Sequence, residues 1–130
     1  MMKLDRIDHI VLTVKDIERT VKFYESVMGM TKVTFAEGRV ALLFGRQKIN
    51  LHQFNKEFEP KADIPTPGSE DLCFITDTDL EQAMAHVKAK GVKIIEGPIK
   101  RTGALGAMLS FYFRDPDGNL IELSQYETEG

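Results

Sequence analysis

The chain lacks tryptophan and has one cysteine, Cys73, among its 130 residues. A single thiol cannot form an internal disulfide, and it cannot build a cysteine-rich zinc site. The sequence also lacks a run of about 20 apolar residues, the length that a membrane-spanning helix needs, and its first residues lack the apolar core of a signal peptide. These absences predict a cytoplasmic protein with no membrane partner.

The chain also lacks an excess of basic residues. It has 17 Lys and Arg against 20 Asp and Glu, a formal net charge of −3. Nucleic-acid-binding domains usually carry a strongly basic face, so this balance argues against a nucleic-acid partner. A hydrophobic share of 42% and a charged share of 28% are ordinary for one globular domain of this length.

The first half of the sequence predicts a strand, a helix and three further strands. Residues 6–14 are rich in β-branched side chains and alternate between two faces, which favours a strand. Asp16 is a suitable N-cap for the helix that follows, and Gly29 is a natural end for it. We expect the remaining strands over residues 32–35, 40–44 and 49–54.

The second half repeats the same order after a proline-containing stretch. Residues 55–69 hold three of the five prolines and are interpreted as a linker. We then expect a helix over residues 80–90 and strands over residues 71–76, 92–95, 108–114 and 119–126. His9 and Asp71 are 62 residues apart, as are Gly29 and Gly91, so strand and helix stay in step between the two halves.

The repeat predicts an α+β fold made of two βαβββ modules in a single domain, residues 1–130. Module one covers residues 4–54 and module two covers residues 70–126. Neither half could bury enough apolar surface alone. We assign His52 and Glu122 to the same place in the fourth strand of each module, 70 residues apart, so eight extra residues must enter before the last hairpin. The glycine-rich residues 100–106 are where we expect them.

Three segments together carry a resemblance to a known superfamily. They are Ile7-Asp-His-Ile-Val11, Phe23-Tyr-Glu-Ser-Val-Met-Gly-Met30 and Phe113-Arg-Asp-Pro-Asp-Gly-Asn-Leu-Ile-Glu122. In this order, the chain resembles the vicinal oxygen chelate superfamily of glyoxalases, fosfomycin-resistance proteins and extradiol dioxygenases. It is most similar to small glyoxalase-domain-containing proteins. The resemblance implies a curled mixed sheet with a cleft, helices outside, and a homodimer.

The resemblance also implies a metal site. Residue by residue, the superfamily's ligand positions fall on His9, His52, Asp71 and Glu122, which would bind one divalent ion of zinc, nickel, manganese or iron. The sequence departs from the pattern of bacterial glyoxalases, which alternate His, Glu, His and Glu. Because the middle pair is exchanged and aspartate is one methylene shorter, Asp71 could instead hold a water or orient an imidazole.

The implied activity is that of a metal-dependent lyase or isomerase acting through an enediolate, with Glu122 as metal ligand and base. The substrate would be a small molecule with two adjacent oxygens, such as the hemithioacetal of methylglyoxal and glutathione or another thiol adduct. An extradiol-type dioxygenase and a non-catalytic small-molecule-binding protein remain alternatives.

Several other residues have two interpretations. Arg46, Lys100 and Arg101 could bind an anionic substrate or could be solvated loop residues. Gly103 and Gly106 could hinge a lid or merely permit a turn. Cys73 is expected to be a small buried hydrophobe rather than a nucleophile, because the sequence indicates no base beside it.

Overall fold

A computed structural model describes residues 1–127 and divides the chain into two compact units. Unit 1 is Met1–Pro67, and unit 2 begins at Gly68. Unit 1 contains β1 (His9–Val14), α1 (Ile17–Met28), β2 (Thr31–Phe35), β3 (Arg39–Phe44) and β4 (Gln47–Gln53). Unit 2 contains β5 (Asp71–Ile75), α2 (Leu80–Ala89), β6 (Glu96–Gly103), β7 (Gly106–Arg114) and β8 (Leu120–Tyr126).

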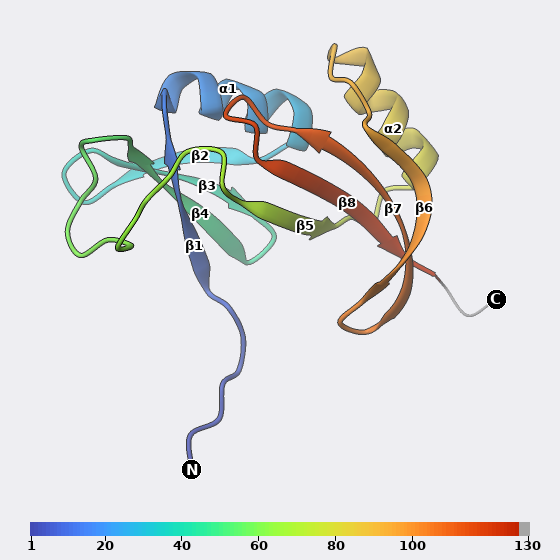
Figure 1. Ribbon diagram of the computed structural model, residues 1–130, viewed down its shortest axis with the longest axis horizontal. Coiled ribbons are helices and arrows are strands. Elements are labelled where there is room, and N and C mark those ends of the chain that lie inside the picture. The colour runs from blue at the N-terminus through green and yellow to red at the C-terminus, as the bar shows by residue number, and fades with distance from the viewer. Residues whose placement is uncertain (128–130) are drawn as a thin grey trace. The chain divides into compact units, whose positions relative to one another are not determined.

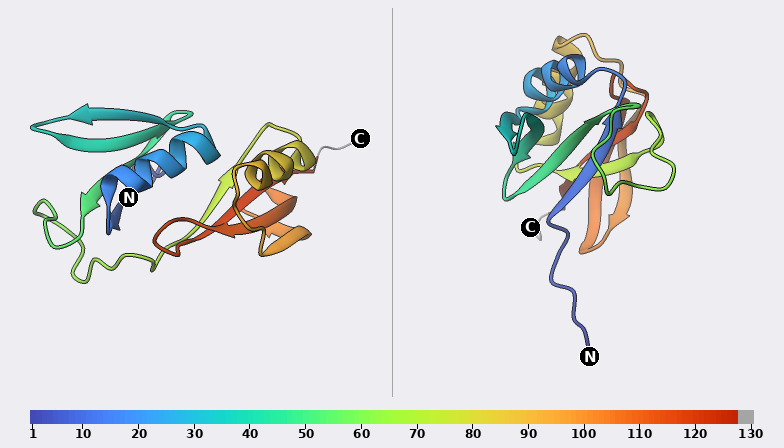
Figure 2. Two further views of the ribbon diagram at one scale, coloured as in Figure 1. Left: turned by 90° about the horizontal axis from the view of Figure 1, so that it is seen from above. Right: turned by 90° about the vertical axis from the view of Figure 1, so that its left-hand side faces the viewer.

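Each unit is a four-stranded mixed sheet with one helix lying across one of its faces (Figures 1 and 2). The strand order is β1-β4-β3-β2 in unit 1 and β5-β8-β7-β6 in unit 2. In both sheets the first and fourth strands pair parallel, and the other neighbours pair antiparallel. The predicted α+β fold of two βαβββ modules is therefore confirmed. No helix of the described chain is long and apolar enough to cross a membrane.

The helices begin where local side chains satisfy their free N–H groups. The Asp16 carboxylate accepts from the Arg19 N–H at 3.1 Å, and the Asp79 carboxylate does the same for Gln82 at 3.4 Å. Gly29 ends α1 with a left-handed φ of 70°, as predicted. The second helix ends with Lys90 as its C-cap, one residue before the expected stop at Gly91.

The strand pairing corrects one part of the predicted repeat. His9 pairs with Lys48 as Asp71 pairs with Leu120, which sets an offset of 72 residues for the fourth strands. Two glutamines confirm this offset: the Gln53 side chain accepts from the first N–H of α1, and the Gln125 side chain accepts from the first N–H of α2. The offset of 70 was wrong.

The corrected offset changes which residues correspond. Asn50, which pairs with Val11, is the counterpart of Glu122, which pairs with Cys73. His52 is the counterpart of Ser124. Module one therefore has an amide where module two has a carboxylate.

The strand predicted over residues 92–95 is also wrong. The strand begins instead at Glu96 and continues to Gly103, because these residues pair with the nine-residue β7. Residues 100–106 thus form the end of a long hairpin and its turn, where Gly103 pairs with Gly106. The Leu105 N–H donates to the Tyr126 hydroxyl at 3.0 Å and fastens this turn. This arrangement agrees with the turn interpretation of the two glycines.

Alternating residues give each sheet a buried face and an open face. The side chains of Leu12, Val14 and Leu51 are at most 1% exposed in unit 1, as Ile121 and Phe113 are in unit 2. The other alternation is the open face of each sheet. For unit 1 it carries His9, Val11, Thr13, Arg39, Ala41, Lys48, Asn50 and His52; for unit 2 it carries Asp71, Cys73, Arg101, Ser110, Tyr112, Glu122 and Ser124.

Candidate functional site

The two predicted histidine ligands both lie on the open face of unit 1, but in different surroundings. His9 is exposed, and its Nδ1 lies 2.8 Å from an Asp8 oxygen. His52 is 7% exposed and contacts the Phe58 ring edge to face, with centroids 5.6 Å apart. His9 is level with Lys48 on β4, four residues from His52. At about 3.3 Å per residue, the two lie about 13 Å apart along the sheet, so unit 1 does not bring them together.

Burial and the positive charge of Arg39 lower the pKa of His52. The folded protein therefore binds fewer protons at this site than the unfolded chain does. The contribution to stability is complete above the unfolded pKa of about 6.5, and it is lost progressively as the pH falls below that value. We expect His52→Gln to flatten the fall in the free energy of unfolding between about pH 7.5 and 5, measured by urea denaturation. His86→Gln, on helix α2, should leave that slope unchanged; an unchanged slope in His52→Gln would contradict the prediction.

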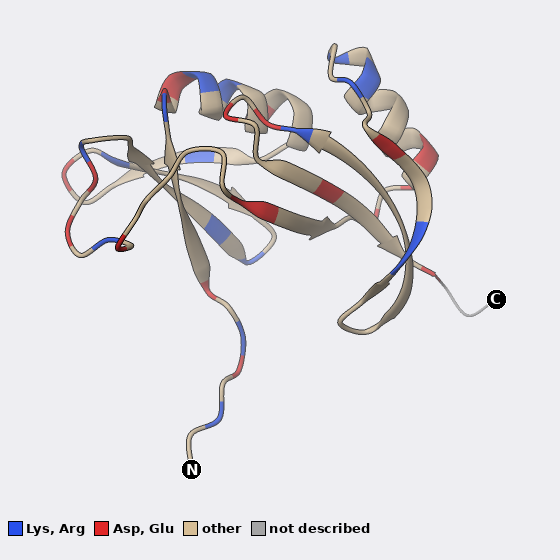
Figure 3. Ribbon diagram, in the orientation of Figure 1, with Lys and Arg blue, Asp and Glu red and all other residues tan. Residues whose placement is uncertain are grey.

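The two predicted carboxylate ligands lie near each other on the open face of unit 2. Asp71 on β5 pairs with Leu120, two residues before Glu122 on β8. This diagonal arrangement places their Cβ atoms about 7–8 Å apart. Figure 3 shows acidic positions on both strands and a basic position on β6. Asp71 is exposed and Glu122 is half-buried.

A chain of hydroxyl groups holds the Glu122 carboxylate. The Ser124 hydroxyl donates to Glu122 Oε2 at 3.2 Å. Because the Ser124 hydrogen is used there, the Ser110 hydroxyl donates to Ser124, at 2.6 Å. The Cys73 thiol lies 3.3 Å from the Ser124 oxygen. These contacts orient the carboxylate from the β7 and β5 sides of the strand.

Cys73 is exposed on this face, so the expectation of a buried cysteine was wrong. Its position follows from the alternation of β5, in which Asp71 and Ile75 are exposed as well. Burial of part of the thiol raises its pKa, and the nearby charges of Glu122 and Asp71 raise it further. A thiol with a raised pKa is a weak nucleophile at neutral pH, which agrees with the predicted absence of a nucleophilic role.

Arg101 and Tyr112 complete the polar surroundings of Glu122. The Arg101 Nε donates to the Tyr112 hydroxyl at 2.8 Å, and an Arg101 amino group lies 3.8 Å from a Glu96 oxygen. Tyr112 lies directly opposite Glu122 on the neighbouring strand. Burial raises the pKa of Tyr112, the hydrogen bond from Arg101 opposes that rise, and Glu122 adds to it. Tyr112 is therefore a neutral phenol at pH 7.

Opposite shifts of the Tyr112 pKa test this arrangement. Arg101→Gln removes the donor that stabilises the phenolate, so the pKa should rise further. Glu122→Gln removes a nearby negative charge, so the pKa should fall toward its usual value near 10. A pH titration followed by NMR of ring-labelled tyrosine measures both shifts. Shifts in the same direction in the two variants would show that the groups do not interact as described.

Of the three cations predicted to bind substrate, the structure brings Arg101 near the Glu122 carboxylate, whose charge raises the pKa of the guanidinium together with Tyr112 and Glu96. Lys100 is exposed and lies on the opposite face of β6, since neighbouring residues of a strand alternate. Arg46 is exposed in the turn between β3 and β4. Within residues 1–127, no three His, Cys, Asp or Glu side chains are grouped closely enough to hold a metal ion.

Sequence reasoning missed Tyr112 and Ser124. The available signal was the alternation of β7 and β8, which puts both on the same face as Glu122 once the strands are paired. Their role depends on cross-strand register, and register was the part of the repeat that we assigned incorrectly.

The comparisons agree with this fold. The family model described as the Glyoxalase/Bleomycin resistance protein/Dioxygenase superfamily matches residues 6–123. The chain belongs to this superfamily. It is 60% identical over 125 residues to "Virulence protein STM3117" of Salmonella typhimurium, covering 96% of this chain and 87% of that one. The solved integron cassette protein VCH_CASS1 of V. cholerae is 64% identical, with a TM-score of 0.96 and coverage of 98% and 99%.

A distant superfamily member shows the same fold with a metal ion. The solved fosfomycin-resistance protein FosX of Listeria monocytogenes, a mutant form complexed with Mn(II), is 20% identical and has a TM-score of 0.67. The match covers 98% of this chain and 94% of that one. Members of the superfamily typically bind a divalent metal ion.

Proposed function

We propose that this protein is a divalent-metal-dependent lyase or isomerase of the glyoxalase type, acting on a small molecule with two adjacent oxygens. Membership of the superfamily supports the reaction class. The observation that carries the proposal is the Glu122 carboxylate, which is half-buried on an open sheet face, held by Ser124, and close to an arginine and a neutral tyrosine. This is a suitable setting for a general base.

The donor set fits a divalent ion. His9 supplies an imidazole, and Asp71 and Glu122 supply carboxylates; all three are exposed or half-buried on open sheet faces. Nitrogen and oxygen donors without a thiolate suit zinc, nickel, manganese or iron. His52 stays a proposed ligand, although its imidazole is packed under Phe58 and lies far from His9 along the sheet. When bound, the ion would polarise the two substrate oxygens.

The protein's own residues would bind the substrate and move the proton. Glu122 would take a proton from one carbon and return it to the neighbouring carbon. Ser124 would keep the carboxylate oriented through its hydrogen bond to Oε2. Arg101, whose charge interacts with the same carboxylate, would attract an anionic part of the substrate. The neutral Tyr112 would donate a hydrogen bond to a substrate oxygen once it is displaced from its present partners.

The test combines elemental analysis with activity. The protein, purified without added metal, should contain about one divalent ion per chain and should isomerise hemithioacetals of methylglyoxal with glutathione or with another thiol. Stoichiometric iron together with oxygen uptake on a catechol would favour the dioxygenase alternative instead. Tight binding of a small molecule by a protein that contains no metal and turns over neither substrate would favour the binding-protein alternative.

The assembly and location are proposed as well. We propose a cytoplasmic homodimer, as the superfamily resemblance implies, with a small-molecule substrate as its other partner. Sedimentation velocity at micromolar concentration should show a dimer, and a monomer alone would contradict the proposal.

A further inference from the structure

We propose that the open face of unit 1 binds a small organic acid, with its carboxylate held by Arg39 and Lys48. This site differs in residues and charge from the Glu122 face of unit 2, and it does not depend on the proposed reaction. Its members all belong to unit 1, from β2, β3, β4 and the segment that follows β4.

Aromatic rings hold both cations on this face. The Arg39 guanidinium carbon lies 4.2 Å from the centre of the Phe58 ring, and the Lys48 ammonium lies 4.3 Å from the centre of the Phe35 ring. Phe35 pairs directly with Arg39 across β2 and β3. The lysine therefore reaches across the sheet to a ring beside the arginine. Both cations are half-buried, so water screens their charge less than on an exposed surface.

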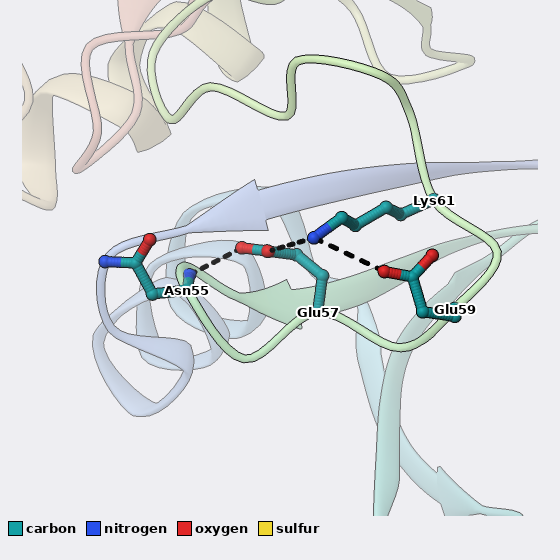
Figure 4. A network of polar contacts seen from close by, with 4 residues as sticks. All are labelled: Asn55, Glu57, Glu59 and Lys61. Atoms are coloured by element: carbon teal, nitrogen blue, oxygen red, sulfur yellow. Dashed lines mark hydrogen bonds and ion pairs between the residues drawn. The ribbon is translucent and has the colours of Figure 1, made fainter.

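Neither cation has a carboxylate partner among the described residues. The acidic side chains that could have served are engaged elsewhere. Figure 4 shows that Glu57 and Glu59 both pair with Lys61, at 3.4 and 3.5 Å, and that Glu57 also accepts from the Asn55 N–H. Lys48 affects Asp8 through its charge, without a hydrogen bond. Two fixed, unpaired positive charges over apolar rings suit an oxyanion attached to an apolar body.

Asn50 adds a requirement for a hydrogen-bond donor. It lies between Lys48 and His52 along β4, and its Oδ1 atom is buried with no hydrogen-bond partner in the described part of the protein. An amide oxygen can only accept, so a ligand hydroxyl or N–H would satisfy it. The chemistry of the whole face thus favours a hydroxy acid with an apolar substituent.

Three matched probes test the proposal on metal-free protein, since hydroxy acids also chelate metals. Mandelate has the carboxylate and the hydroxyl, phenylacetate lacks the hydroxyl, and 1-phenyl-1,2-ethanediol lacks the carboxylate. In calorimetric titrations, mandelate should bind more tightly than either of the others. Arg39→Gln and Lys48→Gln should each weaken mandelate binding about tenfold or more, as expected for loss of a charge-assisted contact.

Controls separate this site from general charge effects. Arg46→Gln removes an exposed cation from the turn next to the site and should bind mandelate as the wild type does. Asn50→Ala should abolish the preference for mandelate over phenylacetate. Should Arg39→Gln fail to fold, Arg39→Lys and Lys48→Gln test the same point. Equal binding of mandelate and the diol, no binding at all, or unchanged affinity in Lys48→Gln would each overturn the proposal.

Discussion

Glu122→Gln is expected to reduce kcat/KM for hemithioacetal isomerisation by about 10²- to 10⁴-fold, the usual contribution of a general base. Glutamine keeps the size and the acceptor oxygen that Ser124 bonds, but it cannot take up the proton. The same substitution should lower the metal content, because a neutral amide is a weaker ligand than a carboxylate. Steady-state kinetics and elemental analysis on the same sample measure both effects.

Glu81→Gln is the matched control for this substitution. Glu81 is exposed in the first turn of α2, so the variant should keep both the metal and the activity. A Glu122→Gln protein with wild-type kinetics would contradict the proposed function. If instead the metal is retained while activity falls, Glu122 acts as the base but is not needed as a ligand.

Gly97→Ala is expected to cost about 2–5 kcal/mol of the free energy of unfolding, the sum of left-handed strain and overpacking. Gly97 has a φ of 123°, which side chains of L-residues rarely adopt. A Cβ built there would lie 2.6 Å from the Phe111 Cβ and 2.7 Å from the Ser110 carbonyl oxygen. Phe111 is fully buried, so neither neighbour can move without disturbing the core of unit 2.

Gly91→Ala separates the two terms. Gly91 also has a positive φ, 80°, but a Cβ there meets nothing within 4 Å. This variant should lose only the strain term, about 1–2 kcal/mol. Urea denaturation of both variants gives the difference. Equal losses would show that the close packing of Gly97 against Phe111 is unimportant.

The sequence by itself determined the elements whose signals are local. Asp16 and Gly29 marked the ends of α1 because a cap side chain and a left-handed glycine act on the nearest backbone groups. The alternation of residues 6–14 separated the buried Leu12 from the open-face His9. Recurrence of the same order after 62 residues was enough to predict two βαβββ modules.

Only the tertiary structure decided which side chains meet. Cross-strand pairing set the offset of 72 that aligns Glu122 with Asn50, and hairpin and turn lengths, which no local signal fixes, control that pairing. The hydrogen bond between Arg101 and Tyr112 likewise joins two strands of one hairpin. Phe58 covers His52 because the segment after β4 folds back over the sheet, a contact that composition and periodicity do not encode. Sequence periodicity assigns a residue to a face; register and loop path decide its neighbours there, and chemistry depends on those neighbours.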